Sequence, residues 1–155
     1  MNERLPASRG RARALAVLLF FAAALPGASS AQGESCDHAG AQSSGVEVRQ
    51  KDGRHFLFAK LGNMTRWSLL VQSNDALASP VVSGDGYRLA YLSREFGQWR
   101  AFLQRLATGY RLETAVFAHR PHRICFSGDG DSLIAVDEDG QVGVISIKSA
   151  WASLN

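Results

Sequence analysis

Four aspartates near the C-terminus, Asp129, Asp131, Asp137 and Asp139, are the residues of this sequence most suited to binding a cation. Calcium takes six to eight oxygen ligands, and carboxylates are among those it prefers, so the cluster is a candidate calcium site. The surrounding glycines and serines predict two successive hairpin turns of one sheet. Such turns lie at opposite ends of a sheet. We therefore favour two solvated turns and expect no metal or other cofactor.

A second group of metal-ligand types combines His119, His122 and Cys125, with Cys36 and His38 as further candidates. Histidine nitrogen and cysteine sulfur are the usual ligands of structural zinc. A spacing of three residues does not repeat in space along a proline-containing loop between two strands, however. Packing or exposed-loop roles are therefore favoured for the histidines.

Catalytic and sugar-binding signals are weak. The sequence contains no nucleophile elbow, metallohydrolase motif or phosphate-binding loop, so no catalytic residue is predicted. Trp67, Trp99 and Trp151 have the rings needed to stack on a sugar, but we interpret them as sheet-packing residues. The sequence therefore favours a protein that is not an enzyme.

The only two cysteines, Cys36 and Cys125, are a candidate disulfide pair. An even number of cysteines is typical of chains that fold in an oxidising compartment. A bond between them would tie the start of the mature chain to a core strand, and on the chain-entropy model it would stabilise the fold by about 4 to 5 kcal/mol. The alternative is that Cys125, between Ile124 and Phe126, is a small buried hydrophobic residue. The sequence leaves both interpretations open.

One turn motif organises the chain: Ser-Gly-Asp-Gly occurs at 83–86 and again, 44 residues later, at 127–130. Short apolar runs flank each copy, which predicts strand, tight turn and strand. A period of this size is typical of repeated four-stranded blades. In such turns the carboxylate caps backbone N–H groups and the following glycine takes a positive φ. The residues interpreted as structural on this basis are Asp52, Gly53, Asp85, Gly86, Asp129 and Gly130.

Apolar runs and turn residues alternate at intervals of about 8 to 12 positions from residue 46 onward, which is the pattern of an all-β domain. We predict a repeat domain at 46–155, with repeats at about 46–72, 79–117 and 123–155. The first repeat is expected to be degenerate, because Asp52 lies 33 residues before Asp85 instead of 44. The last needs a fourth strand from 148–155, which is short and weakly patterned.

The first 31 residues have the composition of a secretory signal peptide. Four arginines precede an apolar run at 14–25, and a proline with small residues follows up to Ala31. This pattern predicts cleavage after Ala31 and a flexible leader at 32–45. The alternative, an uncleaved anchor, lacks the roughly 18 to 20 apolar residues that cross a bilayer. The mature protein is expected to be periplasmic or secreted, with no stable membrane span.

The charge balance argues against nucleic acid as a partner. The chain has 17 lysines and arginines and 14 aspartates and glutamates, and the predicted signal peptide contains four of those arginines and one glutamate. The mature chain therefore has 13 residues of each sign. A neutral surface without a basic stripe does not indicate binding to nucleic acid or anionic lipid.

Ser-Pro and Ser-Gly-Asp-Gly open a hairpin at residues 79–93, and residues 99–109 end in Thr-Gly. With these motifs, the region from about Asp75 to Ile147 resembles the β-propeller repeats of TolB-like periplasmic proteins. Residues 124–147 also resemble a WD-repeat blade, although Ser146–Ile147 stands in place of the usual Trp-Asp. The resemblance implies a partial β-propeller of about three antiparallel four-stranded blades after a cleaved signal peptide.

Propellers close with about four to eight blades, and this chain has fewer than three complete ones. We therefore expect exposed sheet faces that bind copies of the chain or another protein. A different all-β packing or a truncated gene product are the alternatives. The expected function is a non-catalytic module for protein–protein interaction or scaffolding. The functional alternatives are the propeller portion or remnant of a hydrolase of the prolyl-oligopeptidase kind, and a calcium- or sugar-binding exported protein.

Overall fold

A computed structural model describes residues 36, 45–60 and 65–148. The chain divides into two compact units, Met1–Ala31 and Gln32–Asn155, and every described residue belongs to the second. The predicted signal peptide, most of the predicted leader and all but the first residue of the predicted last strand lie outside the described residues. Among the residues described, no helix is long and apolar enough to cross a membrane.

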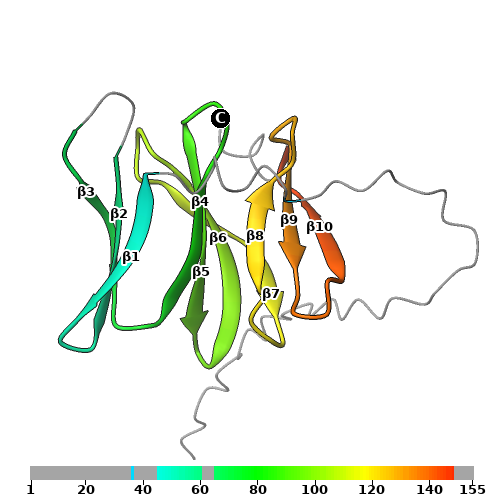
Figure 1. Ribbon diagram of the computed structural model, residues 1–155, viewed down its shortest axis with the longest axis horizontal. Helices are drawn as coiled ribbons and strands as arrows, with labels where there is room; N and C mark the ends of the chain where they lie inside the picture. The colour runs from blue at the N-terminus through cyan, green and yellow to red at the C-terminus, as the bar shows by residue number, and fades with distance from the viewer. Residues whose placement is uncertain (1–35, 37–44, 61–64, 149–155) are drawn as a thin grey trace, which may run out of the picture. The chain divides into compact units, whose positions relative to one another are not determined.

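The described part of the chain forms antiparallel strands in three sheets (Figure 1), which confirms the predicted all-β class. The first sheet has the order β1-β2-β3, the central sheet β4-β5-β6-β7 and the last sheet β10-β9-β8. Only the central sheet has, among described residues, the four strands expected of each blade. The strands are β1 (Val46–Lys51), β2 (Arg54–Ala59), β3 (Ser68–Ser73), β4 (Leu77–Val82), β5 (Arg88–Glu95), β6 (Gln98–Arg105), β7 (Arg111–Phe117), β8 (Arg123–Phe126), β9 (Ser132–Val136) and β10 (Val142–Ser146).

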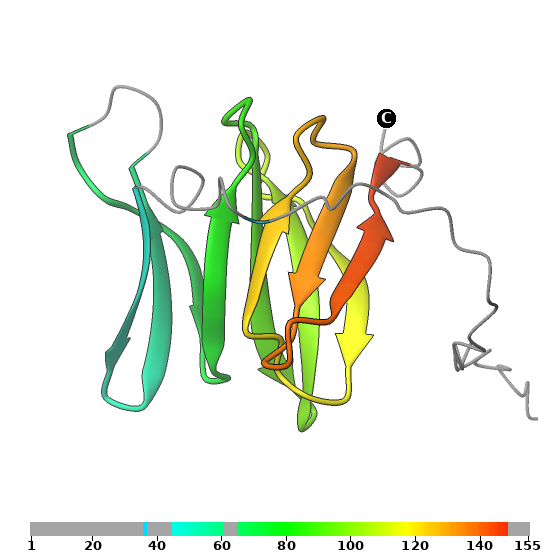
Figure 2. The same cartoon turned by 45° about the vertical axis from the view of Figure 1, so that its right-hand side comes forward.

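The central sheet is covered on both faces, as Figures 1 and 2 show. Successive side chains of a strand point to opposite faces. In β5, Leu89 and Tyr91 therefore pack toward the first sheet, and Ala90 and Leu92 toward the last. All four side chains are fully buried. Two apolar layers, one on each face of the central sheet, thus hold the three sheets together.

The layer between the first and central sheets joins Leu57 to Leu77, Leu89, Tyr91 and Phe102. The rings of Tyr91 and Phe102 lie 5.7 Å apart in a stacked arrangement. Partly buried residues from β1 and β3 complete this layer. The sequence predicts these strands through their alternation of apolar and polar residues.

The layer between the central and last sheets is made mainly of aliphatic residues. Leu92 and Leu103 from the central sheet pack with Ile124, Phe126 and Leu133 from the last. A polar contact crosses the same junction, because Arg88 Nη1 donates a hydrogen bond of 2.7 Å to the carbonyl oxygen of Gly130. The guanidinium also lies 5.5 Å from the centre of the Phe126 ring.

The first sheet follows the same 44-residue period as the others, which corrects the predicted spacing of 33. The Asp52–Gly53 turn joins β1 to β2, and Phe96–Gly97, 44 residues later, joins β5 to β6. Both turns have two consecutive positive φ angles: 51° and 74° in the first, 52° and 79° in the second. This is the geometry of a tight two-residue hairpin. Asp52–Gly53 is therefore the counterpart of Phe96–Gly97 and not of Asp85–Gly86.

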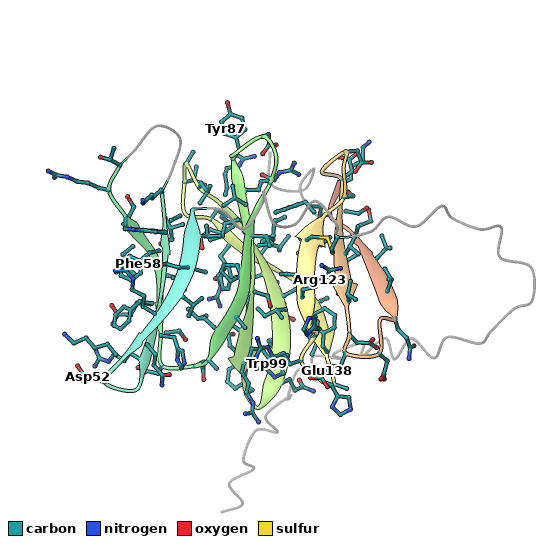
Figure 3. The ribbon with its side chains drawn as sticks, viewed as in Figure 1. Asp52, Phe58, Tyr87, Trp99, Arg123 and Glu138 are labelled. Carbon is teal, nitrogen blue, oxygen red and sulfur yellow. A yellow bond between two sulfur atoms is a disulfide. The ribbon has the colours of Figure 1, made fainter. Side chains whose placement is uncertain are left out.

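A β-bulge supports this corrected alignment. The pairing of β2 with β3 shifts between Leu57 and Phe58, and the pairing of β6 with β7 shifts between Ala101 and Phe102, again 44 residues later. Figure 3 places Asp52 at the end of the fold opposite to Tyr87, which follows the Ser83–Gly86 turn. The first sheet therefore corresponds to β5-β6-β7.

The alignment also shows which strands the end sheets lack. Within the described residues, the first sheet has no counterpart of β4, the first strand of the central sheet. The last sheet corresponds to β4-β5-β6 and, again among described residues, has no counterpart of β7. Over the described residues, the two end sheets thus lack strands at opposite ends of the repeat.

Candidate functional site

The outer face of the last sheet is apolar, and it is open on its β10 side. In this sheet Val136 pairs with Val142, and Ile134 pairs with Val144. Val142 is 55% exposed and Val144 58% exposed. The opposite face of the same sheet, with Leu133 and Ala135, is buried against the central sheet. A sheet with one buried and one open apolar face is typical of a surface that binds another protein.

Cys36 covers one corner of this face. It forms a disulfide with Cys125 of β8, with the two Cα atoms 5.8 Å apart. Both cysteines are buried and form a small cluster with Ile134, against which Val136 packs. The disulfide therefore ties residue 36 to the last sheet, and it leaves the β10 side of the face uncovered.

The outer face of the first sheet has a different character, because its apolar residues are aromatic and lie under cations. Phe56 and Phe58 stack at 6.4 Å, and the guanidinium of Arg49 lies 4.7 Å from the Phe58 ring. Arg49 also forms an ion pair with Glu47. Leu69, which pairs with Phe58 across β2 and β3, is 50% exposed. Figure 3 shows Phe58 on the side of this sheet that faces away from the central sheet.

Trp67 belongs to this aromatic surface, and Trp99 does not. Arg49 and Lys60 lie 5.5 Å and 4.9 Å from the Trp67 ring. Trp99 packs against the layer between the central and last sheets, with Arg120 5.4 Å from its ring. Trp67 lies just before β3 and Trp99 lies in β6, and each ring has a cation beside it. This arrangement does not form a sugar platform. Trp151 lies outside the described residues.

The structure separates the four candidate calcium ligands into two turns. Asp129 and Asp131 lie in the turn between β8 and β9, and Asp137 and Asp139 lie in the turn between β9 and β10. The two turns are at opposite ends of β9, whose five residues span roughly 16 Å at about 3.3 Å per residue. Figure 3 shows Glu138, between the second pair, at the lower end of the sheet. The arrangement does not bring the four carboxylates together.

Asp129 and Asp137 accept hydrogen bonds within their own turns, and Asp131 pairs with Lys148 after β10. Asp129 Oδ1 accepts hydrogen bonds from Ser127 Oγ at 2.6 Å and from the Asp131 backbone N–H at 2.9 Å. These bonds lower the pKa of Asp129. Asp137 Oδ1 accepts a bond of 2.7 Å from the Gln141 N–H. The ammonium of Lys148 lies 2.9 Å from Asp131, which raises the pKa of Lys148.

The Ser83–Gly86 turn repeats this pattern and adds a contact to the next sheet. Asp85 Oδ1 accepts hydrogen bonds from Ser83 Oγ and from the Tyr87 N–H, and Asp85 Oδ2 pairs with Arg88 at 3.0 Å. Partial burial opposes ionisation of Asp85, but these bonds and the Arg88 charge outweigh it and lower its pKa. Because Arg88 also binds Gly130, Asp85 helps to orient the contact between the central and last sheets.

The candidate zinc ligands do not form a site either. His119 and His122 are both exposed in the loop between β7 and β8, and Cys125 is oxidised in the disulfide, so it has no thiolate to offer. His38 lies outside the described residues. Nowhere in the described part of the chain do three or more His, Cys, Asp or Glu side chains gather to hold a metal ion.

Tyr91 is buried where the first and central sheets meet. Its hydroxyl oxygen accepts a long hydrogen bond of 3.4 Å from Arg111 Nη1, and Arg111 Nη2 pairs with Glu95 at 2.9 Å. Burial raises the pKa of Tyr91, so it stays protonated at neutral pH. Burial disfavours the Arg111 charge, but Tyr91 and Glu95 outweigh this and raise the pKa of Arg111. Arg111 also lies 3.9 Å from the Phe102 ring, so the cluster is a packed junction.

A groove that the sequence does not predict lies between the β7–β8 loop and the β9–β10 turn. Its volume is about 360 Å³, and His119, Arg120, Asp137 and Gln141 are among the residues that line it. Their side chains are not arranged as a nucleophile with a hydrogen-bonded base, which covalent catalysis needs. The groove also includes Val142, so it adjoins the open face of the last sheet.

Sequence reasoning also missed Val142 and Val144 as surface residues. It identified the strand that contains them, but it did not identify which of its faces would be open. The signal is present in the repeat, because Ala101 and Leu103 occupy the same positions of the central sheet: Leu92 pairs with Ala101, and Ala90 with Leu103. Those residues are buried only because another sheet packs over them.

Known structures show the class of fold. TolB from Acinetobacter baumannii matches with a TM-score of 0.54 and 23% identity, over 66% of this chain and 28% of that chain. The periplasmic gluconolactonase PpgL of Pseudomonas aeruginosa matches with a TM-score of 0.40 and 21% identity, over 61% of this chain and 30% of that chain. The sequence matches no protein-family model and no curated protein significantly.

The fold is therefore TolB-like and of propeller type, which confirms the resemblance inferred from the sequence. At 23% identity the likeness shows the fold alone. The chain spans less than a third of the length of either matched structure.

Proposed function

We propose that this protein is an exported, non-enzymatic propeller module that binds another polypeptide chain through the outer face of its last sheet. The observation that carries the proposal is the exposure of Val142 and Val144, at 55% and 58%, on a sheet whose other face is buried. Apolar side chains gain free energy when they leave water. Two neighbouring valines held open by a rigid sheet are therefore best explained by a partner that covers them.

Two features support export. The basic and apolar pattern of residues 1–31 is typical of a secretory signal peptide. The disulfide between Cys36 and Cys125 is of the kind that persists in oxidising compartments such as the periplasm or the extracellular space. We therefore place the module outside the cytoplasm.

The other candidate functions have less support. A calcium site needs carboxylates that converge, and the two aspartate pairs lie in turns at opposite ends of β9. A sugar platform needs open aromatic rings, and cations lie over Trp67 and Trp99. The hydrolase-portion alternative would gain support from hydrolase sequence encoded next to this chain at the same locus.

The test is site-specific photo-crosslinking of the exported protein in the cells that make it. A photoreactive residue at position 144 is expected to give a covalent adduct with another polypeptide. The matched control is position 116, because Val116 is also a strand valine, 47% exposed, and lies on neither end face. No adduct at 144, or equal adducts at 144 and 116, would contradict the proposal.

A further inference from the structure

We propose that the partner is a second copy of this chain, and that the open face of the last sheet binds the open face of the second copy's first sheet. This inference rests on the proposed function, because it names the occupant of the same face. It makes the contact a head-to-tail one, with different surfaces on the two sides. The two sheet junctions that already exist within the chain show how such a contact is built.

Each junction joins two kinds of sheet face. One kind, called here the leading face, contains Val48 and Leu57 in the first sheet and Leu92 and Ala101 in the central sheet, and each of these pairs is a cross-strand pair. Both leading faces are covered by the next sheet in sequence. In the last sheet the corresponding pair is Val136 and Val142, and it has no next sheet among the described residues.

The other kind, called here the trailing face, packs against the sheet that precedes it. Tyr91 and Phe102 represent it in the central sheet, where they pack against the first sheet. Leu133 and Ala135 represent it in the last sheet, where they pack against the central sheet. Phe58 and Leu69 lie on the corresponding face of the first sheet, which no described sheet precedes. The described part of the chain therefore has one open face of each kind.

The cation on the trailing face of the first sheet does not prevent packing. In the central sheet, Arg111 lies 3.9 Å from the Phe102 ring and pairs with Glu95 within a packed junction. Phe58 is the residue 44 positions before Phe102, and Arg49 covers it while paired with Glu47. An aromatic ring under a paired arginine is thus already compatible with this type of junction.

The strand positions that the described end sheets lack also fit one another. In the junction of the central and last sheets, Ile124 and Phe126 of β8 pack with Val81 and Ala90 of the central sheet. The counterparts of Val81 and Ala90, 44 residues later, are Cys125 and Ile134. These are the residues that Cys36 covers.

An incoming first sheet has no counterpart of β4 or β8 among its described residues, so it does not need the corner that Cys36 occupies. The uncovered part of the leading face, around Val142 and Val144, is the part that the strands of a first sheet would contact.

The copy number is set by the sheet count. A head-to-tail contact between copies produces either a closed ring or an open filament. Two copies of the three described sheets give six sheets, which lies within the four to eight blades of closed propellers, whereas three copies would give nine. The structure therefore points to a ring of two chains, in which each open face is used once.

The test uses two exposed positions that should tolerate a charge without unfolding. Val144→Asp alters the open leading face, Leu69→Asp the open trailing face, and Val116→Asp is the matched control. Native mass spectrometry of the mature, oxidised proteins is expected to show two-chain complexes for the wild type and the control. Each of the two face variants alone should associate at least tenfold more weakly. An equimolar mixture of the two face variants should form a complex of one chain of each, because one intact junction remains.

Other results would overturn the second-copy proposal in distinguishable ways. If Leu69→Asp stays dimeric and Val144→Asp does not, the contact joins two last sheets, and only the proposed function survives. If the wild type is monomeric and position 144 crosslinks to a different protein, the second copy is wrong and the proposed function stands. If the wild type is monomeric and position 144 gives no adduct, both fail.

Discussion

The leading faces of the central and last sheets are the same part of the repeat in two different surroundings. In the central sheet, Ala90, Leu92, Ala101 and Leu103 are fully buried, because the last sheet covers them. In the last sheet the described residues cover the corresponding face only at the corner where Cys36 lies, and Val142 and Val144 are more than half exposed. The difference comes from the presence or absence of a next sheet in the described fold and not from the residues of the face itself.

The alternation of apolar residues in a repeat therefore determines what a sheet face can bind. The position of the sheet among its neighbours determines whether another sheet of the same chain covers that face. It also separates two roles for similar residues. A central-sheet residue contributes to folding, whereas its counterpart in the last sheet is available for association.

One substitution at the same position in each of the two sheets is expected to give very different losses of stability. Leu103→Asp places a charge in a fully buried layer. We therefore expect the free energy of unfolding to fall by about 4 kcal/mol or more, and little of the protein to fold. Val144→Asp, at the corresponding exposed position, is expected to lower the free energy of unfolding by less than about 0.5 kcal/mol when the protein is dilute enough to be a single chain. Urea unfolding followed by circular dichroism measures both. Similar losses of unfolding free energy for the two variants would contradict the difference in burial between the two faces.

The second prediction concerns the one corner of the open face that is covered. Cys36→Ser removes the disulfide to Cys125, and we expect the free energy of unfolding to fall by about 2 to 5 kcal/mol. Reducing agent should lower the urea midpoint of the wild type to that of the variant and leave the variant unchanged. A variant as stable as the oxidised wild type would show that the bond does not hold the last sheet.

The third prediction compares the two Ser-Gly-Asp-Gly turns. Gly86 and Gly130 both have a φ of 74°, so alanine at either position costs about 1 to 2 kcal/mol of backbone strain. A Cβ on Gly130 would also lie 2.6 Å from Arg88 Nη2, whereas one on Gly86 would meet nothing within 4 Å.

Gly130→Ala should therefore be less stable than Gly86→Ala by about another 1 kcal/mol, the typical worth of one hydrogen bond. Thermal unfolding of the two variants side by side measures this difference. Equal melting temperatures would show that Arg88 moves aside freely and that its bond to Gly130 contributes little to the junction.

The smallest effect is a pH dependence from Asp85. Its pKa is lowered in the folded protein, so its stabilising contribution is present above the unfolded value of about 3.9 and is lost as pH falls through the folded value. Because the carboxylate is largely exposed, we expect Asp85→Asn to cost less than about 1 kcal/mol at pH 7. The difference between wild type and variant should vanish in acid. If the stability difference between wild type and Asp85→Asn persists below pH 2, it arises from packing and not from the charge of Asp85.

Much of the fold could be predicted from the sequence, because turn residues and apolar alternation are local signals. The Ser-Gly-Asp-Gly turns at 83–86 and 127–130 identify the central and last sheets and their period. The predicted alignment of the first sheet is wrong, because Asp52–Gly53 has the same residue types as Asp85–Gly86 and is matched to it on that basis. Its true counterpart, Phe96–Gly97, shares its backbone geometry and not its sequence.

The candidate site could be predicted only in outline. The count of fewer than three complete blades predicts open faces, but it does not say which residues remain exposed on them. That depends on register: Val144 pairs with Ile134 and so shares its face, whereas its neighbour Ile145 packs toward the central sheet. The pairing of Cys36 with Cys125 could not be decided either, because a buried cysteine between two apolar residues has the same sequence pattern whether or not it is bonded.

The most direct test of the central claim is the molar mass of the mature, oxidised wild-type protein, measured by size-exclusion chromatography with light scattering over a hundredfold range of concentration. If the open leading face of the last sheet is a binding surface for a second copy, the mass at high concentration is twice that of the mature chain and falls toward one chain on dilution. A mass of one chain at every concentration would contradict the claim that copies of this protein cover each other's open faces.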